Sequence, residues 1–239
     1  MTLILIALTF GSGATDVAAF SRLGGVFTSV MTGNIVFWGL AAAERSVSLA
    51  SHSAVSIAGY VTGVAGGTWV VHGFKIRGSG KPAEADRDSV LPAHVSWALF
   101  TELVLLAGLA AGWEATGDRP AGWAQFVLLA VTAAAMGVQS TSVNELGLSN
   151  VSTTFLTGTL TGLVSSLARP GQDTPHGTRR FGVLIGLAAG AGLCGLLLAT
   201  VPRAVPALPL AALITALVLS AVPLNNETPS NGEDENPRR

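Results

Sequence analysis

The stretch SVMTGNIVFWG, residues Ser29–Gly39, places a polar Thr-Gly-Asn tripeptide inside an apolar run typical of a helix. A second apolar run, TTFLTGTLTGL at Thr153–Leu163, contains a similar Thr-Gly-Thr element. Glycine weakens a helix, and polar side chains are disfavoured in apolar surroundings unless they find a partner. Two occurrences of the same departure indicate that the architecture or the function needs it.

The composition around these runs is that of a membrane protein. Of 239 residues, 49% are hydrophobic and only 11% are charged, whereas soluble domains carry roughly 25% charge. The apolar residues form long blocks, which favours a polytopic membrane protein. The net charge of −1 gives no indication of a nucleic-acid partner.

Eight apolar blocks follow one another, each near the roughly 17–25 residues that cross a bilayer. They are Met1–Phe20, Val26–Ala43, Val55–His72, Val95–Gly112, Trp123–Val143, Val151–Ala168, Phe181–Thr200 and Val205–Val222. The first block lacks a basic flank, so we expect a membrane helix and not a cleaved leader. The expected fold is all-α, a single transmembrane bundle over residues 1–222. The polar tail, residues 223–239, is expected to be disordered.

Matching letters predict an internal duplication with halves of about 1–117 and 118–222. Leu23-Gly24 matches Leu146-Gly147 at an offset of 123 residues. Two glycine ladders match at the same offset, namely Gly59, Gly63 and Gly67 with Gly182, Gly186 and Gly190. Spacing of four puts each ladder on one helix face, where it serves tight helix packing or a sliding interface between the halves.

Two basic loops, residues 75–88 and 168–180, bear on topology. The positive-inside rule puts both in the cytoplasm, yet three apolar blocks separate them. If the first two blocks of each half form one broken or re-entrant unit, the chain makes six net crossings and the halves are inverted. Both termini are then cytoplasmic. The alternative is eight spans with parallel halves.

Polar residues inside the apolar blocks are the candidate site. The predicted substrate-binding residues are Asp16, Thr32, Gly33, Asn34, Gln139, Thr157, Gly158 and Thr159. The two Thr-Gly elements are expected to face each other near the midplane. Asp16 and Glu102 are the candidates for a coupling carboxylate, because intramembrane acids usually face the bundle interior or a cavity. The alternative for these polar groups is a structural role that only joins helices.

Other chemistry finds little support. The chain has neither a nucleophile elbow nor a zinc-protease motif, and its histidines lack the i, i+4 spacing of a metal pair. We therefore expect no enzyme activity, no cofactor and no metal. The single cysteine, Cys194, is expected to be an apolar packing residue.

Two segments resemble the signature regions of the YoaK-type family of bacterial membrane proteins. They are GATDVAAFSRLGGVFTSVMTGNIV at Gly13–Val36 and GVQSTSVNELGLSNVSTTFLTGTLTGL at Gly137–Leu163. The one mild departure is Val17, where the family pattern has alanine. The resemblance spans nearly the whole chain, about Met1 to Val222. It implies a multi-pass protein of the bacterial plasma membrane and supplies no substrate.

The resulting hypothesis is a small secondary transporter or permease for an unidentified small molecule in the lipid bilayer. A scaffold or partner subunit of a membrane complex is the main alternative, and a membrane-embedded enzyme is a weaker one. A homodimer is compatible with the small size of each half.

Overall fold

The computed structural model describes residues 1–78, 91–146, 156–167 and 177–221. These residues form helices and short joints, without any strand, so the expected all-α fold is confirmed. The helices are α1 (Thr2–Arg22), α2 (Met31–Glu44), α3 (Val47–Gly78), α4 (Ala93–Ala115), α5 (Trp123–Glu145), α6 (Leu156–Leu167), α7 (Gly177–Thr200), the 3-10 helix η3 (Pro202–Ala204) and α8 (Ala207–Ala221).

Six segments of the described chain are long and apolar enough to cross a membrane. They are α1, α3 through Phe74, α4, α5, α7 and the unit formed by η3 and α8. The remaining two helices, α2 with 14 residues and α6 with 12, are too short to cross about 30 Å of hydrocarbon. The chain is thus a polytopic helix bundle in which two of the eight apolar blocks form short helices.

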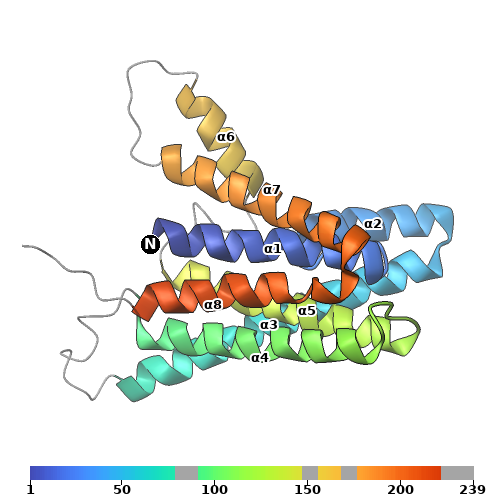
Figure 1. Ribbon diagram of the computed structural model, residues 1–239, viewed down its shortest axis with the longest axis horizontal. Coiled ribbons are helices and arrows are strands. Elements are labelled where there is room, and N and C mark those ends of the chain that lie inside the picture. Colours follow the sequence, from blue (N-terminus) through green and yellow to red (C-terminus); the bar gives the residue numbers. More distant parts are fainter. Residues whose placement is uncertain (79–90, 147–155, 168–176, 222–239) are drawn as a thin grey trace, which may run out of the picture.

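The bundle is built around two central helices, α1 and α5. Of the membrane-spanning residues, 67% are buried in α1 and 72% in α5, against 39% or less in the other four spans. Helices α3 and α4 pack on α5, while α7 and α8 pack on α1. Figure 1 shows α1 and α5 running in opposite directions along the long axis of the molecule.

Glycines allow α3 to approach the backbone of α5. A Cβ atom added at Gly59 would lie 2.6 Å from the carbonyl oxygen of Ala130, and one added at Gly63 would lie 2.0 Å from that of Ala134. No real Cβ atom fits at these distances. The ladder predicted from spacing of four therefore lies at a direct backbone-to-backbone contact, as expected for helix packing in lipid.

The α7 helix approaches α1 in the same way. A Cβ atom added at Gly186 would lie 3.0 Å from the carbonyl oxygen of Ile6, and one at Gly190 would lie 2.0 Å from that of Phe10. Each central helix is thus in close backbone contact with one glycine-bearing helix: α3 packs on α5, and α7 packs on α1.

The chain is non-helical between α1 and α2. Gly24 and Gly25 have φ values of 104° and 74°, a backbone region that other residues rarely adopt, and helix α2 begins only at Met31. The predicted helix start at Val26 was therefore wrong by five residues. The Thr-Gly-Asn tripeptide does not interrupt a helix but lies in the first turn of one.

The second Thr-Gly element has the same position in its helix. Helix α6 begins at Leu156, so Thr157, Gly158 and Thr159 fill its first turn, and the helix start predicted at Val151 lies outside the described residues. Both short helices therefore open with a Thr-Gly pair.

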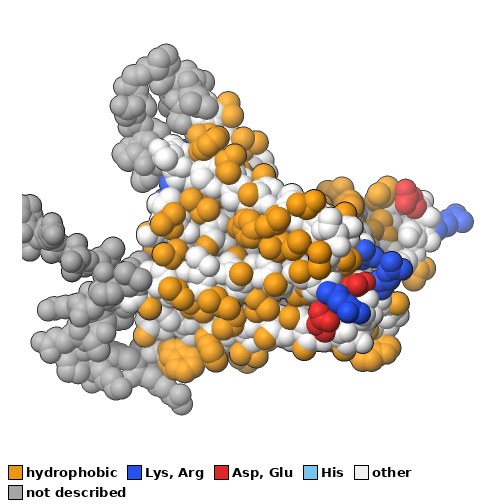
Figure 2. Space-filling view, viewed as in Figure 1, with side chains coloured by type: hydrophobic (Ala, Val, Ile, Leu, Met, Phe, Trp, Pro, Cys, Tyr) orange, Lys and Arg blue, Asp and Glu red, His pale blue; other side chains and the backbone are white. Residues whose placement is uncertain are grey.

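Charged and apolar side chains are segregated along the molecule. In Figure 2 hydrophobic side chains cover the middle of the visible face, and the charged side chains gather at the end where α2 meets α3 and α4 meets α5. The exposed charged residues at these joints and in η3 are Glu44, Arg45, Glu114, Arg119 and Arg203. This distribution is that of a protein whose apolar band faces lipid.

The glycine contacts predict a position-specific loss of stability. Gly63→Ala should lower the stability of the fold by about 1–3 kcal/mol, because the α5 backbone must move away from the new methyl group. Gly66→Ala, on the same helix with open space at its Cβ position, is the matched control and should be neutral or slightly stabilising. Apparent Tm values of the purified variants in detergent measure both. Equal Tm values would contradict the packing described.

Candidate functional site

The carboxylate of Asp16 holds the non-helical segment that follows α1. Its Oδ1 accepts hydrogen bonds from the backbone N–H groups of Thr28 and Ser29, each at 2.8 Å, and from the Thr28 hydroxyl at 3.0 Å. Its Oδ2 accepts one from the Ser29 hydroxyl at 2.6 Å. Asp16 is only 7% exposed, so a buried carboxylate is stabilised by four donors from one loop.

The side-chain amide of Asn34 forms hydrogen bonds with the backbone of Phe27, the residue before Thr28. Its Oδ1 accepts from the N–H of Phe27 at 2.9 Å, and its Nδ2 donates to the carbonyl oxygen of the same residue at 2.7 Å. The same Nδ2 donates to the Ser56 hydroxyl of α3 at 3.0 Å. Asn34 thus replaces, for Phe27, the two hydrogen bonds that a regular helix would have supplied.

Together, Asp16 and Asn34 satisfy three consecutive backbone N–H groups, those of Phe27, Thr28 and Ser29. Irregular backbone at membrane depth is tolerated only where its polar groups are satisfied by protein or water. The rings of Phe20 and Phe37 both stack on Phe27, at centroid distances of 5.4 and 5.7 Å, and also contact each other. The loop is therefore fixed by polar bonds within and aromatic contacts around it.

Gln139 lies where α1 and α5 cross. Its Nε2 donates to the Leu8 carbonyl oxygen at 3.2 Å and to the Ser12 hydroxyl at 3.0 Å. Thr15 lies close by and places its hydroxyl 3.4 Å from the sulfur of Met136. Ser12 lies one helical turn before Asp16, so the crossing and the loop anchor share one face of α1.

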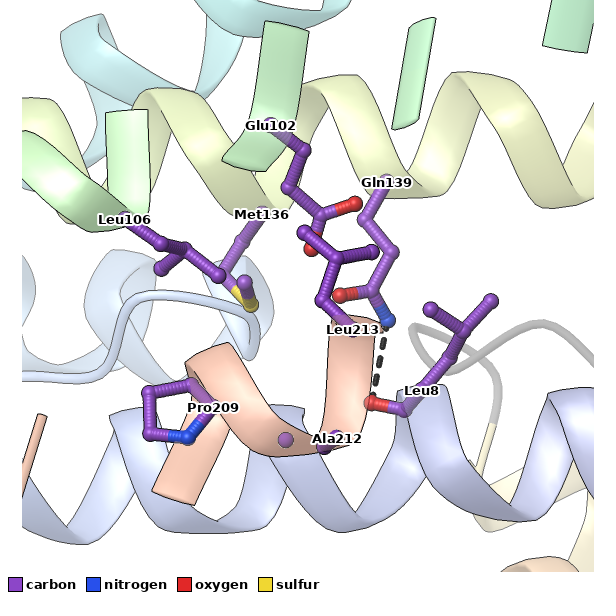
Figure 3. A pocket seen from close by; sticks show the side chains of 9 residues that line it. Leu8, Glu102, Leu106, Met136, Gln139, Pro209, Ala212 and Leu213 are labelled. Atoms are coloured by element: carbon purple, nitrogen blue, oxygen red, sulfur yellow. Dashed lines mark hydrogen bonds between the residues drawn. The ribbon is translucent and has the colours of Figure 1, made fainter. Parts of the chain in front are cut away.

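Glu102 of α4 is the second buried acid and has a different environment. Its side chain is 1% exposed, and its Oε2 has no hydrogen-bond partner among the described residues. Figure 3 shows its carboxyl group and the Gln139 amide directed into the same gap, whose other walls come from α1, α4, α5 and α8. The gap is too small to hold a water molecule.

The two Thr-Gly elements do not meet, contrary to expectation. Helix α2 packs on α3 and helix α6 packs on α7, and Figure 1 shows α6 beside the first part of α7 and α2 at the opposite end of the molecule. In their first turns Thr32 and Thr157 are exposed on the bundle surface, as is Gly158, whereas Gly33 is half-buried beside the Phe27 ring. A shared midplane site is therefore absent from the described residues.

The fourth residue of each short helix points inward. Asn34 is fully buried and Thr159 is 1% exposed. Further along α6, Thr161 donates to the Thr157 carbonyl oxygen at 2.9 Å, which is the local bond that leaves such a hydroxyl harmless in a membrane helix.

Sequence reasoning missed Ser29 and Ser56 as partners of the predicted polar residues. The signal available for Ser29 was its place in a Thr-Ser pair shortly after Gly24-Gly25, because hydroxyl residues following a glycine turn commonly bond to nearby backbone or side-chain groups. Nothing in the spacing of Ser56 distinguishes it from the other serines of α3. Its role follows only from the packing of α3 on α2.

The Asp16 anchor predicts a local effect of a near-isosteric change. In Asp16→Asn one acceptor oxygen becomes an NH₂ group that faces donors, which should destabilise residues 23–30 by about 1–3 kcal/mol. Amide hydrogen exchange followed by mass spectrometry should therefore speed up in this segment by about one to two orders of magnitude. Asp118→Asn, at the α4–α5 joint, is the control and should leave that segment unchanged. Unaltered exchange in Asp16→Asn would show that the carboxylate does not hold the loop.

Comparison with known proteins agrees with this architecture. A family described as "Protein of unknown function (DUF1275)" matches residues 4–221. The chain is 31% identical over 165 residues to the UPF0700 transmembrane protein YoaK of Bacillus subtilis (strain 168), an alignment that covers 69% of this chain and 66%, just under two thirds, of YoaK. No solved structure matches the chain. Because the family match spans nearly all of the described helices, the protein belongs to the DUF1275 family, which includes proteins of the YoaK type.

Proposed function

We propose that this multi-pass membrane protein is a small secondary transporter, built from two inverted repeats, for an unidentified small molecule. The observation that carries the proposal is the broken α1–α2 unit, in which buried backbone is held by Asp16 and Asn34 and not by helical bonds. Discontinuous helices inside inverted repeats form the substrate sites of many secondary transporters.

The close helix crossings support two repeats. On the central helices, the contact residues Ala130 and Ala134 of α5 follow Ile6 and Phe10 of α1 by 124 residues. On the helices that pack against them, Gly186 and Gly190 of α7 follow Gly59 and Gly63 of α3 by 127 residues. A third pair of close helix contacts has the same two offsets, 124 residues between α1 and α5 and 127 residues between α3 and α7. A Cβ atom added at Gly137 would meet the carbonyl oxygen of Tyr60, and one added at Gly13 would meet that of Leu187.

Polar contacts at the centre follow the same relation. At an offset of 124 residues Gln139 corresponds to Thr15 and Met136 corresponds to Ser12, so the Gln139–Ser12 and Thr15–Met136 contacts are equivalents of each other. On this basis the partner of Asp16 is Ser140, and not Gln139 as an offset of 123 implied. The glycines of α3 and α7 likewise correspond at an offset of 127 residues in their contacts, one helical turn more than the offset of 123 that the matching letters gave.

The direction of the helices supports inversion of the halves. Helices α1 and α5 run in opposite directions, as do α3 and α7 (Figure 1). The N-terminus lies at the same end of the bundle as the helix ends that border the two basic loops, namely the end of α3 and the starts of α4 and α7. By the positive-inside rule this end is cytoplasmic, and the membrane is the bacterial plasma membrane.

In this proposal the two candidate carboxylates have different roles. Four donors occupy Asp16, which suits an anchor for the loop, whereas Glu102 has an oxygen without a partner and suits a group that gains and loses a proton.

A scaffold or partner subunit is the second candidate, and one observation favours it. Asp16, Asn34 and Gln139 all direct their hydrogen bonds to other parts of the fold, as residues that merely join helices would do.

Transport currents separate the two proposals. Proteoliposomes on a solid-supported membrane would be exposed to amino acids, carboxylates, sugars, nucleosides, polyamines and organic cations, with and without a pH gradient. We expect one class to give a current under a pH gradient that Glu102→Gln abolishes, because the proposed carrier needs a group at this position that gains and loses a proton. Glu114→Gln, an exposed acid on the same helix, is the control. Folded wild-type protein without a current for any class would favour the scaffold.

A further inference from the structure

We propose that Glu102 and Gln139 form an exchange site that holds a proton in the closed structure and, when the helices around the gap move apart, an organic cation with an apolar body that enters from the bilayer between α1 and α8. The inference deepens the proposed transport function, on which its physiological role rests. The binding itself is measurable without transport.

The Glu102 side chain is isolated from compensating charge. It is 1% exposed, and the other residues that line its gap are apolar or, in the case of Gln139, neutral. An isolated carboxylate in such surroundings is strongly disfavoured, so the group takes up a proton instead. The closed gap therefore contains a carboxylic acid, not a carboxylate.

Gln139 supplies the second polar group of the site. Its Nε2 is committed to Leu8 and Ser12 of α1, and Figure 3 shows its carbonyl oxygen on the side of the Glu102 carboxyl group. An amide oxygen whose NH₂ group is already engaged is an acceptor for a carboxyl O–H or for the N–H of an ammonium group. The proton of Glu102 would thus find an acceptor in the closed gap, and the N–H group of a protonated amine would find it in the opened site.

The exchange balances in charge. When the Glu102 O–H bond breaks, the proton leaves to bulk water and the carboxylate remains in the gap. A monovalent cation that binds beside it when the gap opens restores neutrality, so the site is neutral with either occupant. The cation and the proton therefore compete for one position.

A lipid-facing groove lies next to this position. It has a volume of about 550 Å³ and lies between apolar side chains of α1, such as Phe10, and of α8, with Thr215 as its single hydroxyl. This volume is within the range of about 300–1,000 Å³ that is usual for small-molecule sites. Ala212 lines both the groove and the Glu102 gap, so a small side chain stands between the two spaces.

The chemistry of the walls selects an organic cation. Small metal cations need several oxygen ligands, and the gap offers only the Glu102 carboxyl group and the Gln139 amide as polar side chains. An onium or protonated amine needs one counter-charge for its cationic centre and apolar contacts for its body. The carboxylate supplies the first and the α1–α8 groove supplies the second.

The test uses tetraphenylphosphonium as probe and the full-length protein in nanodiscs, with empty nanodiscs as the reference for partitioning into lipid. Titration calorimetry in buffers of different ionisation enthalpy should show release of about one proton per bound cation. On the acid side, affinity should fall about tenfold per pH unit, as for competition with a single proton. Glu102→Gln should abolish binding, and Glu114→Gln should not change it.

Two further measurements guard against misfolding and locate the entry route. The infrared carbonyl band of a protonated carboxyl group should disappear when the cation binds to wild type, and that change should be missing in Glu102→Gln of unchanged thermal stability. Ala211→Trp in the groove should weaken binding at least about tenfold and leave the infrared band of the unliganded protein intact.

Binding that persists in Glu102→Gln, or that releases no proton, would overturn the inference. Unchanged affinity in Ala211→Trp would overturn the route through the groove. Proton-linked binding without transport of any substrate would remove the transporter proposal and leave this site standing. Transport without tetraphenylphosphonium binding would remove this site alone.

Discussion

The hydrogen bonds from Thr28 and Ser29 to the Asp16 carboxylate are the constraint on which the rest of this structure depends. A chain that leaves helical geometry inside an apolar bundle exposes backbone groups that lipid cannot satisfy. Here a carboxylate from the preceding helix and an amide from the following one, Asn34, satisfy them. The short helix α2 can therefore begin within the bundle and lead into α3.

The second constraint is the close contact between helices from different halves. Gly63 touches the backbone of α5 and Gly190 touches that of α1, so each central helix is packed by helices of the other half. Neither half has its full set of packing partners alone. This interlocked arrangement leaves the Glu102 gap between four helices, two from each half, where a relative movement of the halves would change its size.

Much of the fold could be predicted from the sequence, because apolar blocks of membrane-spanning length are a strong signal. The bundle and the small-residue packing faces followed from composition and from spacing of four. The start of α2 did not, because Val26 and Phe27 are as apolar as helix residues and only the pair Gly24-Gly25 marks the turn. The register of the proposed repeat also could not be read from the sequence, since a ladder of glycines every four residues matches itself equally well after a shift of one turn. The bonding of Asp16 and the isolation of Glu102 are tertiary facts that no local pattern encodes.

If the α1–α2 break forms part of a transport path, as proposed, water must reach it during the cycle, and cysteine accessibility tests this requirement most directly. In a Cys194→Ala background, single cysteines would replace Val26 in the break, Trp69 on the exposed apolar face of α3 and Arg119 at the α4–α5 joint. A charged thiol reagent would be applied from each side of the membrane. We expect labelling at position 26 and at position 119 but none at position 69, which faces lipid. Protection of position 26 from both sides, with position 119 labelled in the same folded protein, would contradict this expectation.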